Sequence, residues 1–118
     1  MRIGVPTKRH DGLDDTVSEV FGKAKTFTIV DVEDGEVKNV QVVDNPASSF
    51  DYGSGPVAVK TLADLKVNLV VVAELGLGAS GLLAHFNIKK ISVESKIRVA
   101  DVIKETLIKL KKDDYEQT

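Results

Sequence analysis

The most distinctive chemical pattern in the chain is the glycine-rich segment Gly76-Leu77-Gly78-Ala79-Ser80-Gly81, which has the spacing G-x-G-x-x-G. It follows an apolar run, opens a short helical pattern, and is followed by Glu94, 18 residues after Gly76. Such a loop can hold a dinucleotide pyrophosphate at a helix N-terminus, with an acid for the ribose. The predicted helix is short, however, and no second nucleotide-binding half follows. A tight strand–helix connection is therefore favoured, and a nucleotide-binding enzyme that uses the Gly76–Gly81 loop is the alternative.

Two histidines are the only side chains expected to titrate near neutral pH, because the sequence contains no cysteine. His10 lies in a long loop, where it could ligate a metal or bind an anion. His85 lies on a predicted helix and is expected to be structural or exposed. Neither histidine has a nucleophile close to it in the sequence, so a hydrolase triad is not indicated. The lack of cysteine also excludes a thiolate nucleophile and cysteine-ligated zinc.

The composition is that of one globular domain. The chain has 118 residues, with 16 basic and 18 acidic side chains and a net charge of -2, so a nucleic-acid partner is not expected. No apolar run approaches the roughly 20 residues of a membrane span, and the first apolar residues are too few for a signal peptide. We therefore expect a cytoplasmic protein with no membrane contact. The first long loop contains acids without the spacing of a calcium loop, and these are predicted to be solvated: Asp11, Asp14, Asp15 and Glu19.

Five strands and three helices are predicted to position these groups. Runs rich in β-branched residues predict strands at 2–6, 26–32, 36–43, 69–73 and 88–93. Asp34-Gly35 indicates a hairpin turn between the second and third strands. Helical periodicity predicts helices that begin at Pro56, span 79–86 with Asn87 as a left-handed terminator, and span 99 to about 111. One domain is expected at 1–112, with a polar C-terminal tail at 113–118.

This order of elements predicts one α/β domain with a mixed sheet, in which the last two strands are parallel. If four of the five strands share one direction, their carboxyl ends meet at one edge, where open α/β sheets bind ligands. Two long loops, 7–25 and 44–55, reach that edge. The candidate site there has three lining side chains and three glycines that allow close approach of the backbone: His10, Asn45 and Tyr52, with Gly53, Gly76 and Gly78.

Several segments follow one another in a specific order: Ser18-Glu19-Val20-Phe21-Gly22-Lys23-Ala24 with the strand Phe27-Thr28-Ile29-Val30-Asp31, then Asp44-Asn45-Pro46, Gly53-Ser54-Gly55-Pro56, the run 67–73, and Asn87-Ile88. Through these segments the chain resembles the dinitrogenase iron–molybdenum cofactor biosynthesis family, from Met1 to about Leu110. The resemblance implies a three-layer α/β/α sandwich of the ribonuclease H-like type. It also implies the sheet order 3-2-1-4-5, with the second strand antiparallel to its neighbours.

In function, the resemblance implies a stand-alone, nitrogenase accessory factor-like protein that is not an enzyme. Such a protein binds or carries an iron–sulfur or iron–molybdenum cofactor precursor, and its partners are metallocluster-assembly or acceptor proteins. Family members often have histidine where this chain has Val20, so only His10 would supply a nitrogen ligand to a metal, and weak binding is expected. A protein-interaction module that has lost cluster binding is a further alternative.

Overall fold

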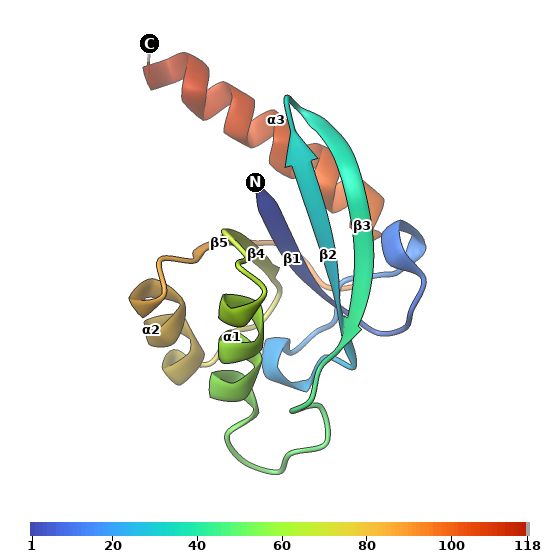
Figure 1. Ribbon diagram of the computed structural model, residues 1–118, viewed down its shortest axis with the longest axis vertical. Coiled ribbons are helices and arrows are strands. Elements are labelled where there is room, and N and C mark those ends of the chain that lie inside the picture. Colours follow the sequence, from blue (N-terminus) through green and yellow to red (C-terminus); the bar gives the residue numbers. More distant parts are fainter. Residues whose placement is uncertain (118) are drawn as a thin grey trace.

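The computed structural model (Figure 1) describes the backbone of residues 1–117 and the side chains of residues 1–76 and 78–111. Five strands form one sheet in the order β3-β2-β1-β4-β5. Their bounds are β1 Arg2–Thr7, β2 Thr26–Glu33, β3 Glu36–Asp44, β4 Leu69–Val72 and β5 Lys89–Ser92. β2 is antiparallel to β1 and β3, whereas β1, β4 and β5 are parallel. The predicted mixed sheet, its order and its parallel last pair are therefore confirmed.

Turn residues explain two of the connections. Asp34 and Gly35 have φ values of 56° and 77°, and a two-residue hairpin needs positive φ at both central positions to match the twist of its strands. Asn87 has a φ of 59° and follows Phe86, the C-cap of the second helix, so the left-handed terminator predicted there is also present.

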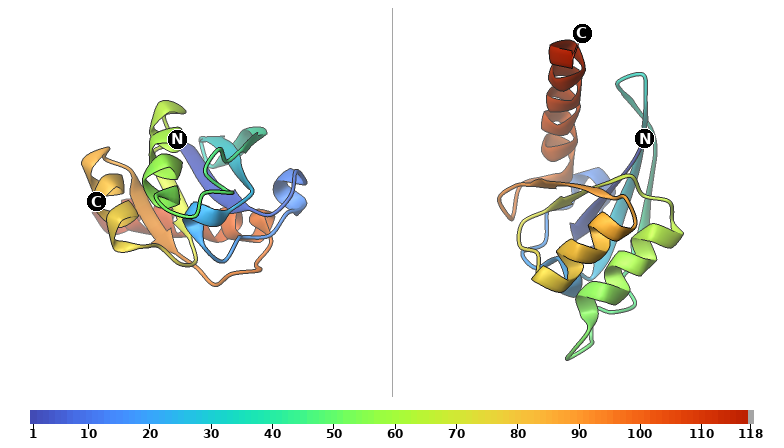
Figure 2. Two further views of the ribbon diagram at one scale, coloured as in Figure 1. Left: turned by 90° about the horizontal axis from the view of Figure 1, so that it is seen from below. Right: turned by 90° about the vertical axis from the view of Figure 1, so that its left-hand side faces the viewer.

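Three α-helices cover the two faces of the sheet, and Figure 2 shows that they do so unequally. The helices α1 (Ser54–Asp64) and α2 (Leu77–His85) pack side by side on one face, and α3 (Val99–Gln117) packs alone on the other. The first face also holds one of two short 3-10 helices, η2 (Phe21–Lys23), whereas η1 (Gly12–Asp14) lies near the start of α3. This is the three-layer sandwich implied by the resemblance.

The helix boundaries differ from expectation, and α1 begins at Ser54 rather than Pro56 while α2 ends at His85 rather than 86. α2 begins at Leu77 rather than 79, so the glycine-rich segment forms its first turns instead of a loop before it. α3 continues to Gln117 rather than ending near Lys111, because no glycine or proline interrupts the sequence there. The backbone at 113–117 is thus helical, and the side chains of the expected polar tail and all of Thr118 lie outside the described residues.

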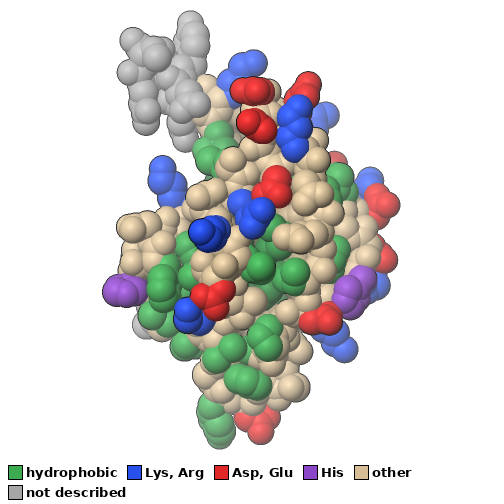
Figure 3. All heavy atoms as spheres, in the orientation of Figure 1, with side chains coloured by type: hydrophobic (Ala, Val, Ile, Leu, Met, Phe, Trp, Pro, Cys, Tyr) green, Lys and Arg blue, Asp and Glu red, His purple; other side chains and the backbone are tan. Residues whose placement is uncertain are grey.

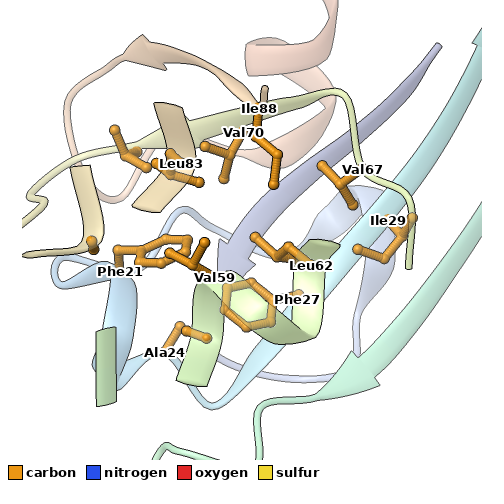
Figure 4. Packing of buried hydrophobic residues seen from close by; sticks show 13 residues of the cluster. Phe21, Ala24, Phe27, Ile29, Val59, Leu62, Val67, Val70, Leu83 and Ile88 are labelled. Atoms are coloured by element: carbon orange, nitrogen blue, oxygen red, sulfur yellow. The ribbon is translucent and has the colours of Figure 1, made fainter. Parts of the chain in front are cut away.

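Each face of the sheet carries its own apolar cluster. Figure 4 shows the cluster under α1 and α2, in which the rings of Phe21 and Phe27 lie 5.5 Å apart. Ile3 and Val5 of β1 face α3 instead. β4 contributes Val70 to the first cluster and Val71 to the second, and both are fully buried. Burial on both faces explains why its sequence is continuously apolar.

Candidate functional site

The carboxyl ends of β1, β3, β4 and β5 lie at one edge of the sheet, as the parallel strands require. β3 also runs in this direction, because it is antiparallel to β2. In Figure 1 the loop between β3 and α1 forms the lower end of the molecule, and η2 lies just above it. The edge divides into two regions whose chemistry differs.

The first region is anchored by the segment before η2, which lies beside the end of β4. The amide of Glu74 donates to the carbonyl of Glu19 (3.0 Å), and the amide of Phe21 donates to the carbonyl of Glu74 (3.1 Å). Val20 and Glu74 consequently form a parallel bridge that extends the sheet by one residue pair. The backbone of Val20 is therefore held from both sides, while its side chain is 42% exposed.

Two glycines allow η2, α1 and α2 to approach one another closely. A Cβ on Gly22 would lie 2.8 Å from the backbone nitrogen of Gly55 and 2.8 Å from the Ser54 hydroxyl, so only glycine fits. A Cβ on Gly55 would lie 3.3 Å from the Cβ of Ala79, which is in the first turn of α2. The N-terminal turns of both helices therefore lie beside the Phe21-Gly22 segment.

The two helix N-termini supply hydrogen-bond donors to this region. Within the described residues, neither Gly53, the N-cap of α1, nor Gly76, the N-cap of α2, provides a side-chain cap, and neither first turn contains an acid. The first amides of a helix have no partner inside the helix, and the helix dipole makes this end positive. We call the region formed by residues 19–22, 52–55 and 74–79 the α1/α2 mouth.

Apolar side chains gather beside the α1/α2 mouth, where green side chains are visible at the lower end of Figure 3. Phe50 is 40% exposed and Tyr52 is 92% exposed. The Lys23 ammonium group donates to the carbonyl of Phe50 and so links η2 to this loop. The mouth can thus offer an anionic group both amide donors and an apolar contact surface.

The second region is a polar pocket of about 420 Å³ at the end of β3, lined by Lys8, Arg9, His10, Lys25, Thr26, Asp44, Asn45 and Ser48. The His10 imidazole is mostly exposed, and its Nε2 lies 2.7 Å from Oδ1 of Asp44. β3 lies three strands from β4, which corresponds to about 14 Å at the usual strand spacing. His10 thus belongs to the pocket at the end of β3, whereas the α1/α2 mouth adjoins the end of β4.

Asn45 does not offer its amide to a ligand, in contrast to the sequence interpretation. Its side chain is buried, and its Nδ2 donates to the carbonyls of Gly22 (3.1 Å) and Ala24 (2.8 Å). Its Oδ1 accepts a hydrogen bond from the amide of Ala47 (3.0 Å). Asn45 instead fixes η2 and the loop after β3, a positioning role that the Asn-Pro turn signal is consistent with.

The other predicted residues belong to the mouth. Tyr52, Gly53, Gly76 and Gly78 all fall within it, and Gly78 lies in the first turn of α2. A Cβ on Gly76, Gly78 or Gly81 would meet no atom within 4 Å. The glycines of the G-x-G-x-x-G segment are therefore not required for close packing, and that interpretation was wrong. The close approaches are made by Gly22 and Gly55.

Residues 1–108 match the family model described as dinitrogenase iron-molybdenum cofactor. The chain belongs to this family. Its fold is similar to the crystal structure of PH0822, with 29% identity, a TM-score of 0.78 and coverage of 91% of this chain and 90% of that one. It is also similar to the apo form of the orange protein from Desulfovibrio gigas, with 27% identity, a TM-score of 0.80 and coverage of 91% and 87%.

A further relative is the uncharacterized protein MJ0580 of Methanocaldococcus jannaschii, which is 30% identical over 76 residues, or 64% of this chain. The matched region spans only 60% of that relative's length. No helix described in residues 1–117 is long and apolar enough to cross a bilayer.

Membership of a metal-cofactor family raises the question of which side chains could ligate a metal. Among the described residues, no three His, Asp or Glu side chains come together in a metal-binding group. His10 and Asp44 form a pair, but Lys8, Arg9 and Lys25 line the same pocket. These cations disfavour a metal ion there. The side chains that line this pocket therefore fit an anionic group better than an iron ion that they would ligate directly.

The loop between β1 and η1 depends on a residue that sequence reasoning placed in solvent. Asp15 is fully buried, and its carboxylate accepts hydrogen bonds from the amides of Arg9 (2.8 Å), Thr16 (2.8 Å) and Lys8 (3.4 Å). The prediction of a solvated acid is therefore wrong for Asp15, although Asp11, Asp14 and Glu19 are exposed as expected. Asp followed by Thr is a common source of local side-chain-to-backbone bonds, and that was the available signal.

Proposed function

We propose that this protein is a non-enzymatic carrier that holds an iron–sulfur precursor of the iron–molybdenum cofactor at the α1/α2 mouth. One observation carries the proposal. The segments 18–24 and 53–56, through which the chain resembles its family, meet at this mouth beside two helix N-termini. Helix N-termini are favourable sites for anions, and sulfide-rich metal clusters are anionic. One structurally similar relative is described as an apo form, which also supports a binding role.

The proposed mode of binding is weak and reversible. With no cysteine in the chain, the cargo keeps its own ligands and is held by backbone amides at the starts of α1 and α2. Tyr52 and Val20 provide apolar contact at the rim, where both are exposed. A carrier requires this behaviour, because its cargo must pass to an assembly or acceptor protein. The exposed rim leaves room for such a partner to reach the cargo.

The decisive variant is Gly76→Asp. A side chain at Gly76 meets no other atom and its φ of -70° suits any residue, so Asp caps α2 without disturbing the fold. Its charge competes with an anionic cargo, and we expect binding to weaken at least about fivefold. Gly76→Asn is the matched control, because it has the same shape and caps the helix without the charge.

Binding is measured by anaerobic titration with an iron–sulfur cofactor precursor, followed by ultraviolet–visible spectroscopy. The expected order of affinity is wild type, then Gly76→Asn, then Gly76→Asp, with His10→Ala and His85→Ala like wild type. If His10→Ala loses binding and Gly76→Asp does not, the polar pocket is the site and the α1/α2 mouth is not. If the wild-type chain binds no precursor, the carrier proposal is wrong and the interaction-module alternative gains support.

A nucleotide-dependent enzyme is the alternative that the G-x-G-x-x-G spacing keeps open. The segment forms the beginning of a helix of nine residues, and no second mononucleotide half adjoins it in the five-stranded sheet of the described chain. We expect isothermal titration with NAD, NADP and ATP to give no saturable binding. Low-micromolar binding that Gly78→Val abolishes would favour the enzyme instead.

A further inference from the structure

The end of the molecule opposite the α1/α2 mouth is formed by two projecting arms. The right-hand view of Figure 2 shows the C-terminal half of α3 and the β2–β3 hairpin rising separately above the rest of the chain. Between them lies a groove of about 940 Å³, lined by Met1, Val32, Glu33, Asp34, Gly35, Glu36, Lys104, Leu107, Ile108, Leu110 and Lys111. The hairpin forms one wall of this groove and α3 forms the other.

The groove is apolar at its base and contains exposed apolar side chains. Val32 is nearly buried, whereas Met1 is 52% exposed and Ile108 is 60% exposed. Leu107 and Leu110 are half-buried against the sheet. Ile108 is exposed next to other apolar side chains of the groove. A contiguous exposed apolar patch of this kind is typical of an interaction surface, whereas a single exposed apolar residue is not.

The two walls of the groove carry opposite charges. The hairpin wall has Glu33, Asp34 and Glu36, and the helix wall has Lys104 and Lys111. In Figure 3, side chains of both signs gather over the hairpin tip and α3 at the upper end. A twofold rotation exchanges the positions of the two walls. The acidic wall of one copy then faces the basic wall of another, so the surface is its own electrostatic complement.

We propose that this groove is a homodimer interface in which a second copy of the chain inserts its α3 arm. In this arrangement, Ile108 of each copy packs on the apolar base of the other copy's groove. Lys104 and Lys111 of each copy face the acidic hairpin of the other. The net charge of only -2 gives little overall repulsion between copies. The two α1/α2 mouths lie at the far ends and stay accessible, and the inference does not depend on what they bind.

The first test is sedimentation equilibrium of wild type and Ile108→Glu across a wide range of protein concentration. The wild-type mass is expected to rise from the 12.8 kDa of one chain towards twice that value. Ile108→Glu is expected to raise the dissociation constant of the dimer at least about tenfold, because it buries an unpaired carboxylate. Lys109→Glu is the matched control, since it places the same side chain on the same helix outside the groove.

The second test uses charge reversal. Lys104→Glu and Glu33→Lys are each expected to weaken the dimer about threefold to tenfold, and the double variant is expected to recover most of the loss. Circular dichroism confirms that each variant is folded. A wild-type chain that stays monomeric at the highest concentration overturns the proposal and leaves the groove to a different polypeptide. A dimer that Lys109→Glu weakens as much as Ile108→Glu also overturns it.

Discussion

The two regions of the carboxyl edge offer chemistry of different kinds. At the α1/α2 mouth the uncapped amides of two helix N-termini lie near the exposed carboxylates of Glu19 and Glu74, and glycines occupy positions 22, 53, 55 and 76. In the polar pocket the groups are side chains, and several are already engaged: His10 with Asp44, Arg9 with Asp11, and Asn45 with three backbone groups. The first region is built by close approach of elements, and the second by hydrogen bonds within loops. Their responses to substitution should differ accordingly.

The largest effect is expected from Gly22→Ala. The added methyl group would lie 2.8 Å from the backbone of Gly55, so η2 and α1 must move apart. Overpacking of this kind costs about 3 kcal/mol of unfolding free energy, measurable by urea denaturation.

Gly35→Ala is a less suitable control because Gly35 has a positive φ. Gly76→Ala is the better control, because the added methyl group meets open space and should change the unfolding free energy by less than about 0.5 kcal/mol. Equal losses at 22 and 76 would contradict the close approach.

A smaller loss is expected from Asn45→Ala in the polar pocket. The substitution leaves the carbonyls of Gly22 and Ala24 without their buried donor, which costs about 2 kcal/mol. His10→Ala removes an exposed pair and should cost less than about 0.5 kcal/mol. Urea denaturation of both variants separates the two roles. If His10→Ala were the more destabilising of the two, the assignment of Asn45 as the positioning residue would be wrong.

The opposite end of the strands contains an ion pair, Arg2–Asp31, whose contribution to stability should depend on pH. Arg2 donates two hydrogen bonds to Asp31, at 2.7 and 3.3 Å, and this guanidinium lowers the pKa of Asp31 from its ordinary 3.8. A carboxyl with a depressed pKa stabilises the fold above pH 3.8 and loses that contribution as the pH falls through its lower, folded value. Wild type should therefore exceed Arg2→Gln in stability at pH 7, and the gap should narrow below pH 4.

Urea denaturation between pH 7 and pH 2.5 measures this difference directly. The variant Lys60→Gln is a suitable control, because Lys60 forms an exposed ion pair with Asp64 and does not contact the Arg2–Asp31 pair. A gap between wild type and Arg2→Gln that stays constant with pH would show that Arg2 acts through its bond to the Leu65 carbonyl alone.

The smallest effect is expected from Gly78→Ala, and its sign is opposite. Gly78 is exposed inside α2 and a Cβ there meets nothing, so alanine should raise the unfolding free energy by about 0.5 to 1 kcal/mol through helix propensity. A rise in the urea midpoint at unchanged slope would confirm this. A loss of stability would show instead that the second glycine of the segment has a structural task.

Local signals in the sequence were enough for most of the fold. Asp34-Gly35 predicts its hairpin because these residue types adopt positive φ readily. The continuous apolar run from Leu69 to Ala73 indicates a strand that is buried on both faces. The strand order required the family resemblance, since no local pattern encodes which strands pair. That order already separates β3 from β4, so the division of the edge into two regions could have been deduced from it.

The contacts that shape the site were not predictable in the same way. Gly22 and Gly55 are distant in the sequence, and the need for glycine at each arises only when the elements pack. Nothing in the sequence distinguishes Asp15 from its exposed acidic neighbours, because its burial depends on the folded path of the loop around it. The G-x-G-x-x-G spacing misled in the opposite direction, because it marks a helix start whose glycines touch nothing.

The double anchoring of the Val20 backbone by Glu74 has a consequence for how binding could change over time. The hydrogen bonds that hold this position are made by its neighbours, the Glu19 carbonyl and the Phe21 amide, so they do not depend on which residue stands at 20, and the Val20 side chain is exposed. Replacement of Val20 therefore alters the ligand chemistry of the mouth without altering its shape. The fold and the chemistry of the mouth can therefore change independently, since a substitution of Val20 by histidine or cysteine adds a metal-ligating side chain while the framework around it stays intact.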